Sequence, residues 1–152
     1  MKYCIFILSI FFTLSAWSQL PRKTNSLIGT WEFKNGSGFE VWSKEGTRLI
    51  GYEYRLNKIG DSIKVAKMML EKVNKVLLYT FITNLTTPDI DIQKEKVIFV
   101  GGKRKMKFYN RLSSIPYRID YVFSFFSREK LKIRMYYGQD DKPVKLILKK
   151  VN

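Results

Sequence analysis

The chain has 152 residues, of which 45% are hydrophobic and 15% aromatic, so it is too apolar to be disordered and long enough for one domain with its own core. It carries 28 Lys and Arg against 13 Asp and Glu, a formal net charge of +15. It has one cysteine and no histidine, which excludes Ser-His-Asp, Cys-His and His-ligated zinc chemistry because each needs an imidazole. We therefore expect no enzymatic activity, no cofactor and no metal site.

Residues 1–18 have the pattern of a cleaved signal peptide. A short positive start precedes an almost wholly apolar run at residues 3–14, and Ala16 and Ser18 are the small residues that a signal peptidase reads. This run is shorter than the roughly 20 apolar residues that a membrane-spanning helix needs. Cleavage after Ser18 would remove the only cysteine, Cys4. We expect export to a bacterial periplasm or to the exterior, where a disulfide-free domain of this size can be stable on its core alone.

The mature chain, residues 19–152, is expected to be a single domain of short antiparallel strands. Its apolar residues alternate with polar ones with a period of two, as where Leu131, Ile133 and Met135 share one face of a run and cations share the other. Turn residues such as Asn, Gly and Asp separate these runs at short intervals. The expected strands lie at residues 27–33, 39–43, 47–56, 62–72, 76–83, 97–100, 104–109, 117–125, 130–135 and 144–149.

Residues 62–75 also fit a helix, because their charged side chains have loosely helical spacing. We favour a strand, since a hairpin signal flanks the segment on each side. A meander of this length must hide its edges, and closure into a barrel does so. The sequence thus predicts an all-β fold, an antiparallel barrel or a strongly curved meander sheet.

Short motifs in this chain resemble those of lipocalin-like (calycin) barrels, and more specifically those of a family of small secreted bacterial proteins of unknown function. Gly29-Thr30-Trp31 is similar to the Gly-x-Trp start of these barrels. The other motifs of the bacterial family appear as Glu40-Val41-Trp42-Ser43, Leu49-Ile50-Gly51, Phe108-Tyr109-Asn110, Pro116 and Tyr121. The family usually carries His-Asp-Phe-Pro before the late strand, where this chain has Ser113-Ser114-Ile115-Pro116. Any role that the His or Asp has in that family is therefore not expected in this chain.

The resemblance implies a structural role for Trp31. In lipocalin-like barrels the Trp of the first strand closes one end of the barrel, usually under a basic side chain from a late strand. We expect Arg134 to be that partner, since a guanidinium over an indole gains about 0.5–2 kcal/mol.

The candidate ligand-binding residues lie on two neighbouring strands. Alternation places Glu40 on the same side as Trp42, so Glu40 would be a buried acid if that side faces the lumen, whereas an outward Glu40 would pair with a lysine. Tyr52 and Tyr54 share one face of the next strand, and hydroxyls on such faces can reach a cavity mouth. We therefore expect a non-catalytic binder of a small, partly apolar ligand, with contacts from these four residues. Packing alone is the alternative role for Trp42.

The positive charge is concentrated late in the chain, where residues 94–152 hold sixteen Lys and Arg against five Asp and Glu. An alternative function is therefore an envelope-associated module that binds polyanions or a membrane surface of anionic lipid. A nucleic-acid partner is not expected, because the aromatic side chains fall mostly on the opposite face and cannot stack on bases. A third alternative is a barrel with a filled core that acts through protein contacts. Alternation places on the outward face Lys130, Lys132, Arg134, Lys145 and Lys149.

Overall fold

The computed structural model describes residues 19–83, 85, 96–101, 106–110, 116–124, 128–138 and 142–151. The expected signal peptide, residues 1–18, lies outside this part of the chain. A short 3-10 helix, η2 (Arg22–Leu27), precedes the strands and was not predicted from the sequence. The strands are β1 (Gly29–Phe33), β2 (Gly38–Glu45), β3 (Arg48–Leu56), β4 (Ser62–Val73), β5 (Val76–Thr83), β6 (Lys96–Gly101), β7 (Lys107–Tyr109), β8 (Arg118–Phe123), β9 (Lys130–Tyr136) and β10 (Val144–Val151).

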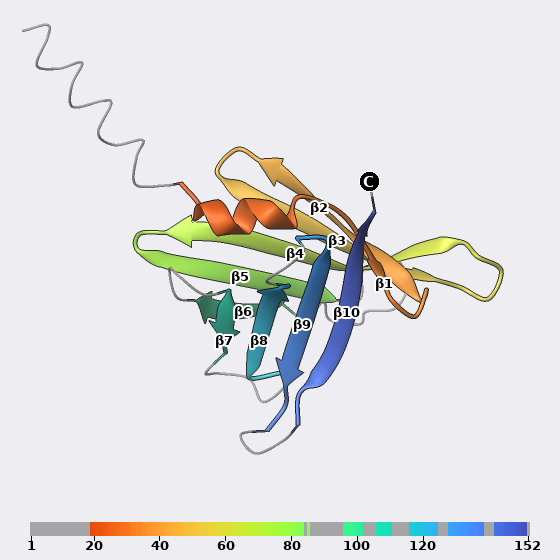
Figure 1. The fold of residues 1–152 in the computed structure, drawn as a ribbon. Coiled ribbons are helices and arrows are strands. Elements are labelled where there is room, and N and C mark those ends of the chain that lie inside the picture. The colour runs from red at the N-terminus through yellow and green to blue at the C-terminus, as the bar shows by residue number, and fades with distance from the viewer. Residues whose placement is uncertain are drawn as a thin grey trace, which may run out of the picture.

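Consecutive strands pair antiparallel from β1 to β10, and β1 also pairs with β10, so the sheet closes into a barrel. Figure 1 shows β8, β9 and β10 running across the long strands β3, β4 and β5. Closure leaves no free edge among these ten strands. This is the reason for which barrel closure was expected of a meander of this length. The prediction of an all-β antiparallel barrel is confirmed.

The ambiguous segment at residues 62–75 forms strand β4, so the strand interpretation is correct and the helical one is wrong. Its side chains alternate between the two faces, with Ala66, Met68 and Leu70 buried. The register between β3 and β4 shifts between Glu53 and Tyr54, whose partners are Ala66 and Lys64. This irregularity leaves the two faces of β3 unchanged on either side of it.

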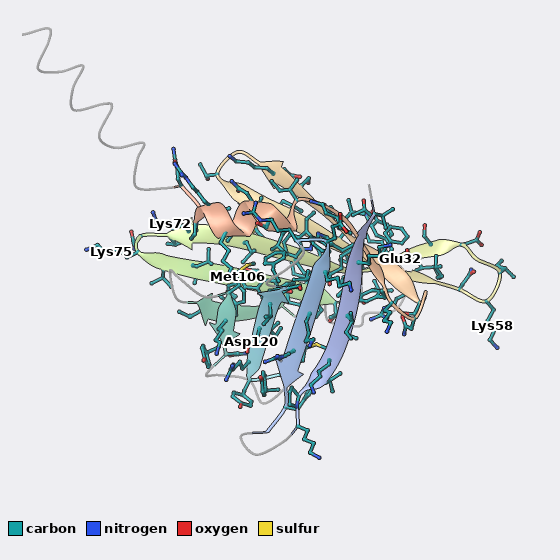
Figure 2. All side chains as sticks on the ribbon, viewed as in Figure 1. Glu32, Lys58, Lys72, Lys75, Met106 and Asp120 are labelled. Atoms are coloured by element: carbon teal, nitrogen blue, oxygen red, sulfur yellow. The ribbon has the colours of Figure 1, made fainter. Side chains whose placement is uncertain are left out.

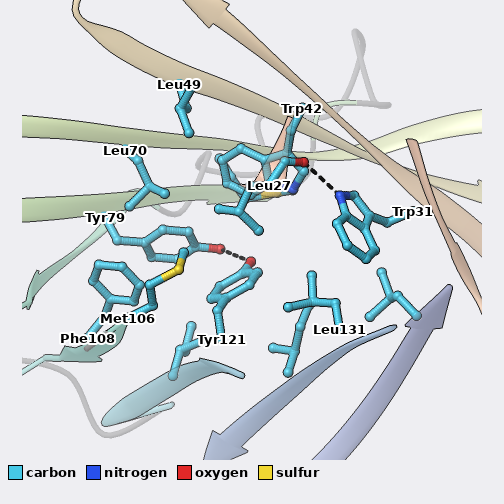
Figure 3. Packing of buried hydrophobic residues seen from close by; sticks show 14 of the residues in the cluster. Leu27, Trp31, Trp42, Leu49, Leu70, Tyr79, Met106, Phe108, Tyr121 and Leu131 are labelled. Atoms are coloured by element: carbon cyan, nitrogen blue, oxygen red, sulfur yellow. Dashed lines mark hydrogen bonds between the residues drawn. The ribbon is translucent and has the colours of Figure 1, made fainter. Parts of the chain in front are cut away.

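We call the end of the barrel beside η2 the helix end, and the end with the β1–β2 and β3–β4 turns the far end. At the helix end the interior is filled by large side chains, among them Trp31, Trp42, Tyr79, Phe108 and Tyr121, each no more than 4% exposed (Figure 3). Leu27 of η2 is buried in the same cluster. The helix end is therefore closed by packing.

Two glycines make room for these aromatic side chains. Gly51 is the cross-strand partner of Trp42, and Gly101 is the cross-strand partner of Phe108. A Cβ atom on Gly51 would lie 2.7 Å from Cδ2 and from Cε2 of Trp42, well inside van der Waals contact. The absence of a side chain at these positions therefore lets each ring lie flat against the neighbouring strand.

Candidate functional site

Glu40 and Trp42 both point into the barrel from β2. Glu40 is 3% exposed and Trp42 is 1% exposed. The indole Nε1 of Trp42 donates a hydrogen bond of 2.9 Å to Oε2 of Glu40. The expectation that the two side chains share an inward face is met, and an outward Glu40 paired with a lysine is not what the structure shows.

Burial raises the pKa of Glu40 from 4.5 to about 7. Loss of hydration is the largest cause, since it penalises the charged carboxylate. The hydrogen bond from Trp42 and the charge of Arg55 oppose it, and the charge of Glu53 adds to it. Near neutral pH, Glu40 therefore exists both as an acid that can donate a hydrogen bond and as a carboxylate that only accepts one.

Two tyrosines add a second polar pair deep in the interior. The hydroxyls of Tyr79 and Tyr121, from β5 and β8, lie 3.0 Å apart (Figure 3). Burial raises the pKa of both phenols well above 10, and the negative charge of Glu40 adds to the increase. Alternation placed Tyr121 on an apolar face, but sequence reasoning did not single out this pair, because the two residues are 42 positions apart.

A third polar group lies on the inner wall toward the far end. Glu53 is directly opposite Glu40 in the β2–β3 ladder, and Arg55 follows on the same face of β3. Nε of Arg55 lies 2.6 Å from Oε1 of Glu53. Nη1 of Arg55 donates a hydrogen bond of 3.0 Å to Oγ of Ser37. The guanidinium also lies 4.5 Å from the ring centre of Phe33. The side chain of Arg55 is 39% exposed and that of Glu53 13%, so this pair is in contact with solvent.

Three inward apolar side chains near the far end are only partly buried, whereas Phe33 at the end of β1 is 3% exposed. Phe81, Met135 and Leu146 pack against the core and keep part of their surface accessible. An open pocket of about 360 Å³ lies at the surface between the β1–β2 turn and β10, and it is lined by Phe33, Lys34, Asn35, Lys145, Leu146 and Ile147. The inner wall near the far end combines partly accessible apolar surface with charged groups.

The structure does not bring Tyr52 and Tyr54 to this interior site. Tyr52 is paired with Val41, on the face of the sheet opposite Trp42. The ring of Tyr54 stacks on Phe39 with centres 4.9 Å apart, and Nζ of Lys64 lies 4.1 Å from the ring centre of Tyr52. Since Trp42 needs the glycine at position 51 across from it, the tyrosines on either side of Glu53 must face outward. Glu53 and Arg55 occupy the inward positions instead.

The predicted cation above Trp31 is also a different residue. Nζ of Lys150 lies 5.5 Å from the ring centre of Trp31, and the two residues are cross-strand partners in β1 and β10. Arg134 lies on β9 between the inward residues Ile133 and Met135, so it faces outward. The basic side chain from a late strand that lies over Trp31 is thus Lys150 and not Arg134. The indole Nε1 of Trp31 donates a hydrogen bond of 2.7 Å to the carbonyl of Leu27.

Lys150→Met is expected to lower the free energy of unfolding by about 0.5–1 kcal/mol, because methionine keeps an apolar stem over Trp31 and loses the ammonium group. Equilibrium denaturation followed by circular dichroism measures this change. Lys149→Met removes a cation from the exposed side of the same strand and is the control, with an expected change of less than about 0.5 kcal/mol. Equal losses in the two variants would contradict a specific contact between Lys150 and Trp31.

Comparison of the chain with protein families, curated proteins and solved structures gives no match. Among the described residues, no group of three or more His, Cys, Asp or Glu side chains is arranged to hold a metal ion. No helix in the same part of the chain has the length and apolar character needed to cross a membrane.

Proposed function

We propose that this protein is a non-catalytic barrel that binds a small, partly apolar ligand through its far end. The apolar part of the ligand would lie against Phe81, Met135 and Leu146, and its polar group would meet Glu53 and Arg55. Glu40 lies deeper on the same wall. As a carboxylate it would accept a hydrogen bond from the ligand, and as a neutral acid it would donate one.

One observation carries this proposal, namely the row of charged side chains on the inner wall of the barrel. Burying such groups without partners is costly, and Glu40 is left with a strongly raised pKa rather than an ion pair of its own. A few polar groups converging on an apolar wall are typical of small-molecule sites. Barrels of about eight strands can hold one small ligand or be filled by their own side chains, and this one has ten strands.

We also infer that the chain is exported after removal of residues 1–18, and that it is related to the lipocalin-like barrels. The leader pattern supports export. The Gly-x-Trp start and a closed antiparallel barrel whose first-strand Trp lies under a late lysine support the relationship. The lack of histidine throughout the chain, and of cysteine beyond residue 18, supports a binding role rather than a catalytic one.

A substitution that fills the far end tests the binding site. Leu146→Trp places an indole where the ligand would enter, and Lys149→Trp places the same side chain on the outer face of the same strand. With the neutral fluorescent probe N-phenylnaphthylamine, we expect Leu146→Trp to weaken binding by about ten-fold or more and Lys149→Trp to change it by less than about two-fold. We further expect native mass spectrometry of the protein isolated from its own cells to show a retained small molecule. Absence of both the retained molecule and probe binding would overturn the proposal.

A further inference from the structure

The outer surface of β8, β9, β10 and the end of β1 is dominated by cations. We call this surface the basic face and define it by six residues that point away from the core: Lys34, Lys130, Lys132, Arg134, Lys145 and Lys149. The strand register places them side by side, with Lys149 opposite Lys130 and Lys145 opposite Arg134. The alternation in the sequence predicted this outward placement for the five residues on β9 and β10.

The acidic residues on these strands do little to neutralise the basic face. Glu32 lies opposite Lys149 in the β1–β10 ladder. Asp120 is only 1% exposed, and its two oxygens are held by Arg118, with Nε at 2.7 Å from Oδ1. Asp120 is also the cross-strand neighbour of Arg134, yet the buried Nε of Arg134 has no hydrogen-bond partner among the described residues. Among the described residues of these strands, the basic face therefore carries more cations than acidic groups.

A groove lined by both apolar and basic side chains lies on the basic face. Its volume is about 380 Å³, and Lys34, Lys130 and Lys132 are among the residues that line it. The exposed aliphatic residues Val122 and Ile147 line it, at 36% and 42% of their surface. Two exposed β-branched side chains thus lie beside lysines on the same face.

We propose that the basic face docks on the surface of a bilayer rich in anionic phospholipid. The lysine and arginine side chains would contact headgroup phosphates, each cation contributing to attraction by the negative surface potential. Val122 and Ile147 would meet the apolar boundary beneath the headgroups. This inference concerns the outside of the barrel and is independent of the ligand site within it.

The same observations favour a membrane over a soluble polyanion. The apolar side chains of the groove gain nothing from a sugar or phosphate polymer. Two aromatic rings beside the basic face are already engaged, because the guanidinium of Arg118 lies 5.4 Å from the ring centre of Tyr109 and 4.4 Å from that of Tyr136. They are therefore not free platforms for stacking nucleic-acid bases.

Vesicle sedimentation with the full chain tests the proposal. We expect vesicles with about 30% phosphatidylglycerol in phosphatidylcholine to bind the protein far more strongly than pure phosphatidylcholine, and to lose it between about 50 and 500 mM salt. Lys130→Glu/Lys132→Glu should weaken binding by about ten-fold or more. Lys58→Glu/Lys75→Glu changes the net charge equally at two exposed hairpin tips far from β9 (Figure 2), and it should weaken binding by less than about three-fold. Residues 1–18 are common to all these proteins, and binding to pure phosphatidylcholine measures the background that they add to each variant.

A second variant separates a membrane from a polymer. Ile147→Ser keeps every charge, and we expect it to lower vesicle binding by about three-fold or more while leaving retention on heparin unchanged. Circular dichroism of each variant establishes that the barrel is folded. The proposal is overturned by equal losses in the two charge-reversed variants, by vesicle binding that does not respond to anionic lipid, or by an unchanged Ile147→Ser variant. The last result would assign the basic face to soluble polyanions.

Discussion

Glu40→Gln is expected to stabilise the protein at about pH 8 by up to about 3 kcal/mol and to leave its stability near pH 4.5 almost unchanged. The pKa of the Glu40 carboxyl rises from 4.5 to about 7 on folding, because burial penalises its charged form. The folded protein therefore holds this proton up to about pH 7, whereas the unfolded chain releases it near pH 4.5. The stability contributed by the proton is complete below pH 4.5 and is lost as the pH rises through about 7. Glutamine stays neutral throughout and still offers an oxygen to the indole of Trp42.

The measurement is the free energy of unfolding of wild type and variant between about pH 4.5 and 8, taken from denaturant titrations. The difference between the two curves isolates Glu40 from the other ionisable groups. Glu45→Gln, at the exposed end of the same strand, removes the same formal charge and is the control. Its curve should run parallel to that of the wild type. A parallel curve for Glu40→Gln as well would show that Glu40 titrates in the folded protein as it does in water.

Gly51→Ala is expected to lower the free energy of unfolding by about 1–3 kcal/mol, even though alanine is normally tolerated better than glycine in a strand. The added Cβ would meet Trp42 at 2.7 Å, and the indole is held by Glu40 and by the surrounding core. Either the ring or the β3 backbone must move. The hydrogen bond between Trp42 and Glu40 would be strained in both cases, so indole fluorescence is expected to change with stability.

A double-mutant cycle checks that the cost arises from this contact. Trp42→Leu alone creates a cavity and is itself destabilising, by about 2–5 kcal/mol. In the Trp42→Leu background, Gly51→Ala should cost less than about 0.5 kcal/mol, which gives a coupling energy of about 0.5 kcal/mol or more. Additive effects of the two substitutions would contradict the proposed packing of the indole on Gly51.

Much of the fold could be predicted from the sequence, because each strand has its own period-two pattern and its own turn. The segment at residues 76–83 was predicted with the bounds that the structure has. Helix η2 was missed because its stability is tertiary: Leu27 is buried in the core, and its carbonyl accepts the indole hydrogen of Trp31. The six residues of η2 carry no sequence signal typical of a helix, and no side chain caps η2 with a hydrogen bond.

The candidate site could be predicted only in part, for a reason of register. Alternation correctly grouped Glu40 with Trp42, but it could not say which face of β3 lies beside them. That depends on the pairing of Trp42 with Gly51, which turns Glu53 inward and Tyr52 outward. For Trp31, alternation along β9 already placed Arg134 on the outward face, whereas the position of Lys150 over the indole depends on how β10 pairs with β1.

The pairing of β1 with β10 also determines when the molecule can be completed. Thr30 is among the first residues of the barrel to be synthesised, and its partner Val151 is among the last. During synthesis the growing sheet therefore carries an unsatisfied edge at each side, and neither edge can be protected until the final strand emerges. Loop closure across nearly the whole chain makes such a fold slow to form. Until Val151 pairs with Thr30, the two outermost strands of the open sheet can pair with other chains.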